Sequence, residues 1–174
     1  MPGFLTVLGT YHELQGSKKR PGNINDPLYE ELVTYLIQDQ AIDFVFEEAT
    51  GLGPTTAEHL SGKLVGANRY LDVDPPTQRR QIFGIPSETN KPLMLGTPMS
   101  NPPNIGWANW QPIRTHEARE RLWLERIKNQ AFNKGLMICG IAHMLSFAFH
   151  VQDARFEVKA IDYLPRQKFP EAVS

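Results

Sequence analysis

The sequence predicts an α/β fold with a mostly parallel central sheet flanked by helices, and a site at the carboxyl edge of the strands. Two short apolar runs, at residues 4–8 and 136–139, have the composition of strands that are buried on both faces. Segments with helical spacing separate the predicted strands, which is the pattern of β-α-β crossovers. Each of the two apolar runs also ends at a glycine that is followed three residues later by a histidine.

Length and composition limit the class of protein. The chain has 174 residues, which we expect to form a single α/β domain over residues 1–174. Its net charge of −1 provides no broad basic surface for a nucleic acid, and no apolar run has the length of a membrane span. One cysteine excludes an internal disulfide, and the first residues lack the basic region of a signal peptide. We therefore expect a cytoplasmic protein with no nucleic-acid or membrane partner.

Strands and helices alternate in the first half of the chain. A polar loop is predicted at residues 13–23, directly after the first strand. A helix then begins at Asp26 and Pro27, which have the pattern of an N-cap followed by proline at the first helical position. The second strand is predicted at residues 42–46, and the next helix at residues 55–65.

A short third strand is predicted at residues 70–74, and its Asp72 and Asp74 are secondary candidates for the site. The composition then changes over residues 84–112, which contain six prolines and two tryptophans. This segment is too long and too aromatic for a passive connector, so we interpret it as an ordered loop or a lid over the site. The alternative is a loop that only covers the core.

The last third of the chain returns to a regular pattern. A helix is predicted at residues 116–132 with Thr115 as its N-cap. It is followed by the apolar strand at residues 136–139, a buried helix at residues 144–151 and a last strand at residues 156–163.

A Gly-x-x-His pattern follows each of the two apolar strands, at Gly9–His12 and at Gly140–His143. With 13 glycines and 5 histidines in the chain, random placement gives ~0.4 matches to this pattern. If the strands are parallel, their carboxyl ends lie at one edge of the sheet. Both histidines should then converge there with Glu47 and Glu48, which end the second strand. Because side chains alternate along a strand, these two glutamates cannot share a face.

Two imidazoles and one carboxylate are the three protein ligands of many catalytic divalent metal sites. Zn, Mn, Fe and Co are all chemically admissible for such a set. We expect His12, Glu47 and His143 to bind the ion, with the choice between Glu47 and Glu48 left open. A water bound to the metal would be the nucleophile.

Three further residues are predicted to take part in catalysis. Glu48 is the expected general base. Arg119 and Glu120 lie near the first turn of the helix predicted at residues 116–132, and Arg119 is expected to hold an oxyanion, a carboxylate or a phosphate. The alternative for Arg119 and Glu120 is a surface ion pair on an amphipathic helix.

The order of these motifs resembles the TraB/Tiki superfamily, which includes the erythromycin-esterase-like and ChaN-like proteins. The resemblance implies an α/β fold with one site built from the two histidines, the glutamate and the arginine. Members are metal-dependent proteases, esterases and a haem-iron-binding lipoprotein. The usual Arg-Asn or Arg-Asp of the family is replaced here by Arg-Glu, and the chain is shorter than most members. The matching segments are Gly9-Thr-Tyr-His12, Glu47-Glu48, Arg119-Glu120-x-x-Trp123 and Gly140-Ile-Ala-His143.

The function that we expect is a metal-dependent hydrolase that cleaves an amide, ester or phosphoester bond in a small-molecule or peptide substrate. Two alternatives use the same residues. One is a metal- or haem-binding protein without turnover, and the other is a metal-independent hydrolase with histidine as the general base. In a further alternative, the histidines only satisfy hydrogen bonds within a structural domain.

Overall fold

The computed structural model describes residues 3–16, 26–49, 54–75 and 114–163 of the chain. The predicted loop or lid at residues 84–112 lies outside these ranges. The elements are, in chain order, β1 Phe4–Thr10, α1 His12–Gln15, α2 Pro27–Asp39, β2 Phe44–Glu47, α3 Thr56–Leu64, β3 Tyr70–Asp72, α4 Arg114–Lys128, β4 Lys134–Gly140, α5 Ile141–Asp153 and β5 Glu157–Asp162. None of the helices in the described ranges combines the length and the apolar character that a membrane crossing requires.

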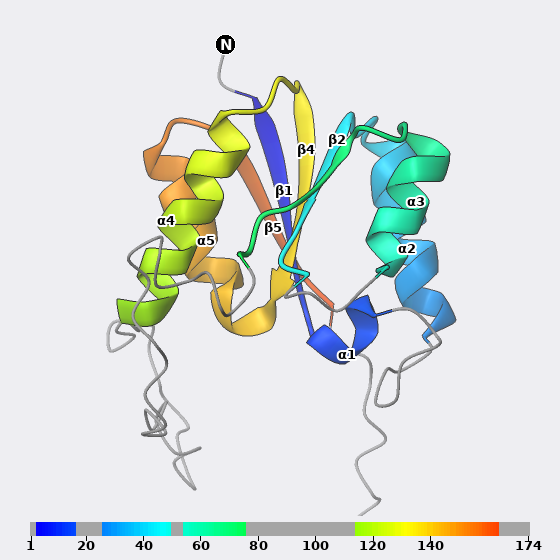
Figure 1. Cartoon of the computed structure of the whole chain (residues 1–174), viewed down its shortest axis with the longest axis horizontal. Coiled ribbons are helices and arrows are strands. Elements are labelled where there is room, and N and C mark those ends of the chain that lie inside the picture. The colour runs from blue at the N-terminus through cyan, green and yellow to red at the C-terminus, as the bar shows by residue number, and fades with distance from the viewer. Residues whose placement is uncertain (1–2, 17–25, 50–53, 76–113, 164–174) are drawn as a thin grey trace, which may run out of the picture.

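The five strands form one sheet in the order β3-β2-β4-β1-β5. Figure 1 shows β4 between β1 and β2. Every neighbouring pair of strands is parallel. Their carboxyl ends therefore lie at the same edge of the sheet. The predicted α/β class with a parallel central sheet flanked by helices is confirmed.

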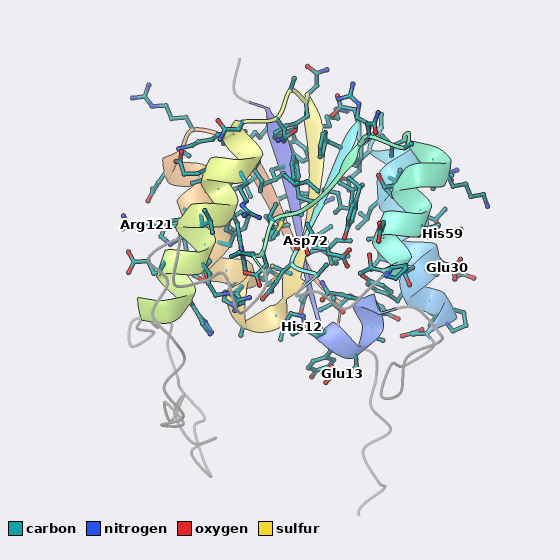
Figure 2. All side chains as sticks on the ribbon, in the orientation of Figure 1. His12, Glu13, Glu30, His59, Asp72 and Arg121 are labelled. Atoms are coloured by element: carbon teal, nitrogen blue, oxygen red, sulfur yellow. The ribbon has the colours of Figure 1, made fainter. Side chains whose placement is uncertain are left out.

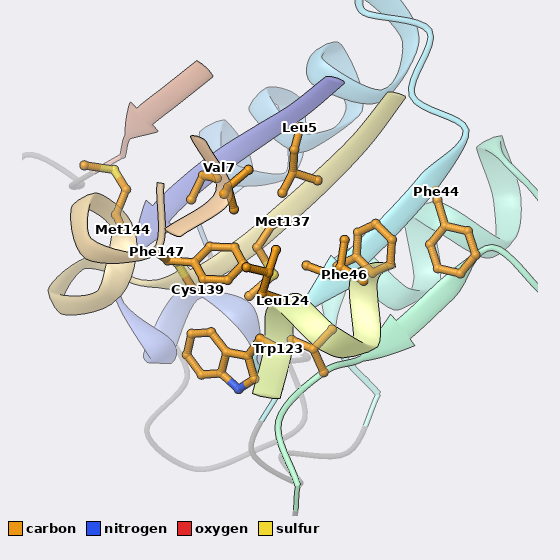
Figure 3. Packing of buried hydrophobic residues seen from close by; sticks show 13 residues of the cluster. Leu5, Val7, Phe44, Phe46, Trp123, Leu124, Met137, Cys139, Met144 and Phe147 are labelled. Carbon is orange, nitrogen blue, oxygen red and sulfur yellow. The ribbon is translucent and has the colours of Figure 1, made fainter. Parts of the chain in front are cut away.

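Helices cover both faces of this sheet. α4 and α5 lie on one face, and α2 and α3 on the other (Figure 1). Side chains of β1 alternate between the two cores, because successive residues of a strand point to opposite faces. Leu5 and Val7 enter the core under α4 and α5, whereas Leu8 enters the core under α2 and α3. Figure 3 shows the first of these cores, where the rings of Trp123 and Phe147 pack edge to face with centroids 5.8 Å apart.

Two predictions near the histidine motifs are wrong in detail. The polar loop predicted at residues 13–23 begins with a turn of helix, since α1 includes His12 and extends to Gln15. The strand predicted at residues 136–139 continues through Gly140, and α5 begins at the next residue, Ile141, and not at Met144. Gly140 has φ −58° and ψ 141°, an extended conformation that leads directly into the helix.

The boundaries of α4 also differ from the prediction. The helix begins at Arg114, so Thr115 is not its N-cap, and it ends at Lys128. Phe132 lies beyond the helix end and packs edge-on against Phe46 of β2, with ring centroids 5.2 Å apart. Its apolar character therefore reflects packing against the sheet and not membership of the helix.

Candidate functional site

The two Gly-x-x-His motifs lie side by side because β1 and β4 are parallel neighbours. Thr10 at the end of β1 is paired in register with Gly140 at the end of β4. His12 follows in α1, and His143 lies in the first turn of α5. Figure 2 shows His12 at the carboxyl end of the strands, with His59 on the outer side of α3. Parallel pairing thus brings together two motifs that are distant in the sequence.

Glu48 lies close to both histidines. Its Oε1 atom is 3.8 Å from Nε2 of His12 and 3.8 Å from Nε2 of His143. Its Oε2 atom accepts a hydrogen bond of 2.8 Å from the backbone N–H of Gly140. A Cβ atom on Gly140 would lie only 2.8 Å from Nε2 of His12, so this close approach requires glycine. The carboxylate of Glu48 is fully buried among these groups.

Glu47, the predicted metal ligand, points to the opposite face of the sheet. Its Oε2 atom accepts hydrogen bonds from the hydroxyls of Thr55, at 2.5 Å, and Tyr70, at 2.8 Å. Burial raises the pKa of Glu47 to about 8, so the group is largely protonated at neutral pH. A carboxyl group must lose its proton to bind a metal. The structure therefore brings Glu48, and not Glu47, to the two histidines.

Arg119 provides a permanent positive charge beside Glu48. Its Nη2 atom donates to Oε1 of Glu48, and its Nε atom donates to Oδ1 of Asp74 at 3.1 Å. Its Nη1 atom lies 3.3 Å from Nε2 of His143, and its guanidinium stacks on Trp123 at 5.1 Å from the ring centroid. Burial alone would lower the pKa of Arg119, but Glu48 and Asp74 raise it, so the buried side chain stays charged.

We define the carboxyl-edge cluster by its five side chains: His12, Glu48, Asp74, Arg119 and His143. Asp74 is one of the two secondary candidates from the sequence, and its Oδ1 atom also accepts a hydrogen bond of 2.9 Å from the indole of Trp123. The other candidate, Asp72, accepts hydrogen bonds from the backbone N–H groups of Ala49 and Asp74. Asp72 therefore supports the loop after β2 and lies outside the cluster.

Hydrogen bonding determines the tautomers of the two histidines. A guanidinium has no acceptor, so Nε2 of His143 must accept, and the proton of its neutral ring lies on Nδ1, which donates to Glu120 at 2.8 Å. Burial lowers the pKa of His143 to about 4, which keeps the ring neutral at pH 7. Nδ1 of His12 lies 2.7 Å from the side-chain carbonyl of Gln15, which can only accept. In the neutral ring of His12 the lone pair is therefore also on Nε2.

Glu120 is the centre of a second group of side chains, located between α4 and α5. Its Oε1 atom accepts from Nδ1 of His143 and from the hydroxyl of Ser146 at 2.6 Å, and its Oε2 atom lies 3.4 Å from Nε2 of His150. The ring of His116 is 4.1 Å from that of His143, measured between centroids. Burial raises the pKa of Glu120 to about 7. We define the α4–α5 histidine cluster as His116, Glu120, His143 and His150.

His116 and His150 are candidates that the sequence prediction misses. A signal for each is present in the sequence. His116 lies four residues before Glu120, which places both on one face of a helix. His150 follows His143 by two helical turns. What the sequence does not show is that these two faces meet.

The residues of the carboxyl-edge cluster fit a divalent metal only in part. The second ring nitrogen of each histidine is held by another side chain, as is usual for histidines that bind metals. However, Oε1 of Glu48 and Nε2 of His143 are two of the atoms that the ion would need, and both accept hydrogen bonds from Arg119. A cation is already bonded to these lone pairs. The arrangement is therefore better suited to proton transfer than to metal ligation.

Comparisons with protein-family models, with curated proteins and with solved structures give no match to this chain. The resemblance to the TraB/Tiki superfamily rests on the motifs and on their order.

Proposed function

We propose that this chain is a hydrolase that cleaves an ester, amide or phosphoester bond, with His12 as the general base and Arg119 as the positive charge beside the reacting group. The observation that carries the proposal is the buried carboxylate of Glu48, which binds Arg119 and faces Nε2 of both motif histidines. The cluster lies at the carboxyl edge of a parallel sheet, where α/β proteins usually bind their ligands.

His12 is the member of the cluster that water and substrate can reach. Its side chain is 43% exposed, compared with 4% for His143. The 3.8 Å between Nε2 of His12 and Oε1 of Glu48 is too long for a hydrogen bond but suits one water molecule bonded to both atoms. In the proposed reaction this water gives a proton to Nε2 of His12, and its oxygen attacks the substrate. The leaving group then takes the proton from His12, which returns the ring to its neutral form.

Arg119 and His143 have supporting roles in this proposal. The guanidinium holds Glu48 through Nη2 and His143 through Nη1, so one planar group fixes both side chains. Its charge lies in a buried, low-dielectric region, where it stabilises a developing oxyanion more than it would in water. His143 is a positioning residue, because its neutral ring orients the guanidinium and is itself oriented by Glu120.

Metal-dependent hydrolysis is the second candidate, with His12, Glu48 and His143 as ligands. It is favoured by the equal distances of 3.8 Å from Oε1 of Glu48 to both Nε2 atoms. Two ligand atoms of one tetrahedral ion lie roughly 3.4 Å apart, so small movements would bring these atoms into range. The ion would supply an acidified water in place of the one held by His12. Arg119 would first have to give up its hydrogen bonds to Oε1 of Glu48 and to Nε2 of His143.

The test is a screen of ester, amide and phosphoester substrates with the full chain, in the presence and in the absence of a chelator. We expect hydrolysis that survives the chelator, is abolished in His12→Ala and falls roughly tenfold to thousandfold in Arg119→Lys. Arg119→Lys keeps the charge but loses the planar fork that holds two partners. His59→Ala removes an exposed histidine of α3 and is the matched control, with activity equal to that of the wild type.

Two results would decide against the proposed mechanism. Activity that depends on added metal and disappears with the chelator would support the metal-dependent candidate. Activity that is the same in His12→Ala and in His59→Ala would exclude His12 as the general base. If none of the three substrate classes is cleaved, the hydrolase proposal itself is rejected.

A further inference from the structure

The α4–α5 histidine cluster contains a buried carboxylate with incomplete hydrogen bonding. Glu120 is 0% exposed, and its Oε2 atom has no hydrogen-bond partner among the described residues. The nearest cationic candidate is Nε2 of His150 at 3.4 Å, which does not make a hydrogen bond with it. A buried acceptor without a partner is uncommon in folded proteins and is often explained by an ion or a water.

The side chains of this cluster come from two helices. His116 and Glu120 lie one helical turn apart on α4, and His143 and His150 lie two turns apart on α5. α4 and α5 pack against each other on the same face of the sheet (Figure 1). Three of the five histidines of the chain therefore gather around one carboxylate, although they come from separate segments.

Among the described residues, Arg119 donates hydrogen bonds to two of the three carboxyl groups near its charge, and Glu120 is the third. Three buried carboxyl groups, those of Glu48, Asp74 and Glu120, interact with the charge of Arg119. The guanidinium donates hydrogen bonds to Glu48 and to Asp74. Glu120 is instead bonded by the neutral ring of His143 and by a serine hydroxyl. A second cation at this place would offset the remaining negative charge.

We propose that the α4–α5 histidine cluster binds one Zn²⁺ ion, or a divalent transition ion with similar preferences. Potential ligand atoms of His116, Glu120 and His143 lie within 4.8 Å of one another. His150 is the fourth ligand, and its 3.4 Å separation from Oε2 of Glu120 matches the roughly 3.4 Å between two ligands of a tetrahedral ion. Imidazole nitrogens with one carboxylate select Zn²⁺ or Co²⁺ over Mg²⁺ or Ca²⁺.

Two rearrangements would convert the cluster into a closed site. His116 is half-buried, and its ring would move toward the other ligands when the ion binds. If His143 binds through Nδ1, its neutral ring carries the proton on Nε2 in place of Nδ1, so Nη1 of Arg119 must give up its hydrogen bond to Nε2. The metal site is separate from the position of the catalytic water proposed beside His12, and binding of the ion does not depend on hydrolytic activity. It therefore goes beyond the proposed function.

The experiment uses the full chain purified without a metal-affinity tag. Titration with Co²⁺ should produce the visible absorption bands of tetrahedral cobalt and reach saturation at one ion per chain, and Zn²⁺ should displace the cobalt. We expect His116→Ala and Glu120→Gln to weaken binding by at least about a hundredfold, because each removes a ligand. His150→Ala should retain some affinity but lose the tetrahedral spectrum. Unfolding curves of each variant show that it is folded.

Two control variants locate the ion. His59→Ala removes an exposed histidine of α3, and His12→Ala removes the accessible histidine of the carboxyl-edge cluster, so both should bind Co²⁺ as the wild type does. Binding that is lost in His12→Ala but kept in His116→Ala would place the ion at Glu48 and overturn the proposal, as would the lack of any saturable binding. Hydrolysis is measured in a separate assay with chelator present. The hydrolase proposal and the metal-site proposal can therefore fail independently of each other.

Discussion

Glu47 has a carboxyl group that the folded protein keeps protonated far above its ordinary pKa. Burial raises its pKa from 4.5 to about 8, although the hydroxyls of Thr55 and Tyr70 act in the opposite direction. Over the range between these values the folded state holds a proton that the unfolded chain has lost. Because the folded pKa is the higher one, the stability contributed by Glu47 is fully present below the unfolded pKa. It is lost as the pH rises through the folded pKa.

The size of this effect follows from the shift. Stability falls by about 1.4 kcal/mol for each pH unit between the two values, which gives on the order of 4 kcal/mol from about pH 5 to about pH 8. A typical domain is stable by about 5–15 kcal/mol, so the loss should be easy to measure. Glu47→Gln keeps a carbonyl oxygen for Thr55 and Tyr70 but cannot ionise. We expect the variant to match the wild type near pH 5 and to be the more stable protein above about pH 8.

The assay is urea unfolding of both proteins at several pH values, followed by circular dichroism. The difference between the two curves isolates Glu47, because Glu120 and His143 are present in both proteins. Glu31→Gln, at an exposed position of α2, is the control and should run parallel to the wild type. A difference between wild type and Glu47→Gln that stays constant with pH would refute the description of Glu47 as a buried, neutral acid on the far face of the sheet.

The remaining predictions concern the glycines and the buried ion pair. Gly140→Ala should lower hydrolysis by about a hundredfold, because its Cβ displaces the ring of His12. Its stability should change little, since the φ of −58° suits alanine. Gly9→Ala places a Cβ 2.7 Å from a side chain of α5 and should cost about 1–3 kcal/mol in urea unfolding; equal stability losses in the two variants would contradict this distinction. Arg119→Met should cost about 3–5 kcal/mol, and adding Glu48→Gln should recover part of that loss in a double-mutant cycle. A double variant whose loss equals the sum of the two single losses would show that the pair is not coupled.

The fold could be predicted because its signals are local. The apolar runs of β1 and β4 are buried on both faces, as strands in the middle of a parallel sheet must be. Asp26 caps α2 by accepting from the N–H of Leu28, and Thr55 caps α3 by accepting from the N–H of Glu58. Each of these patterns depends on residues close together in the sequence, and each was visible without knowledge of the tertiary structure.

The orientation of the strand-end glutamates could not be predicted for a physical reason. Phe44, Val45 and Phe46 are all apolar and all buried, so β2 carries no alternation of polar and apolar residues that would identify its faces. Either glutamate was therefore compatible with the site. The structure resolves this through packing, because Val45 joins the core under α2 and α3 while the two phenylalanines join the core under α4 and α5. Glu47 then follows Val45 by alternation, and Glu48 reaches Arg119.

The repeated Gly-x-x-His motif has a structural explanation that neither copy provides by itself. A Cβ on Gly9 would collide with Met144 of α5, the helix that carries His143, at 2.7 Å. A Cβ on Gly140 would collide with Nε2 of His12, which belongs to the other copy, at 2.8 Å. Each glycine thus makes room for the histidine-bearing helix of the other motif. Because β1 and β4 are neighbours in register, the two motifs form one interlocking unit. A side chain added at Gly140 should displace the ring of His12, and one added at Gly9 should displace the first turn of α5, which carries His143.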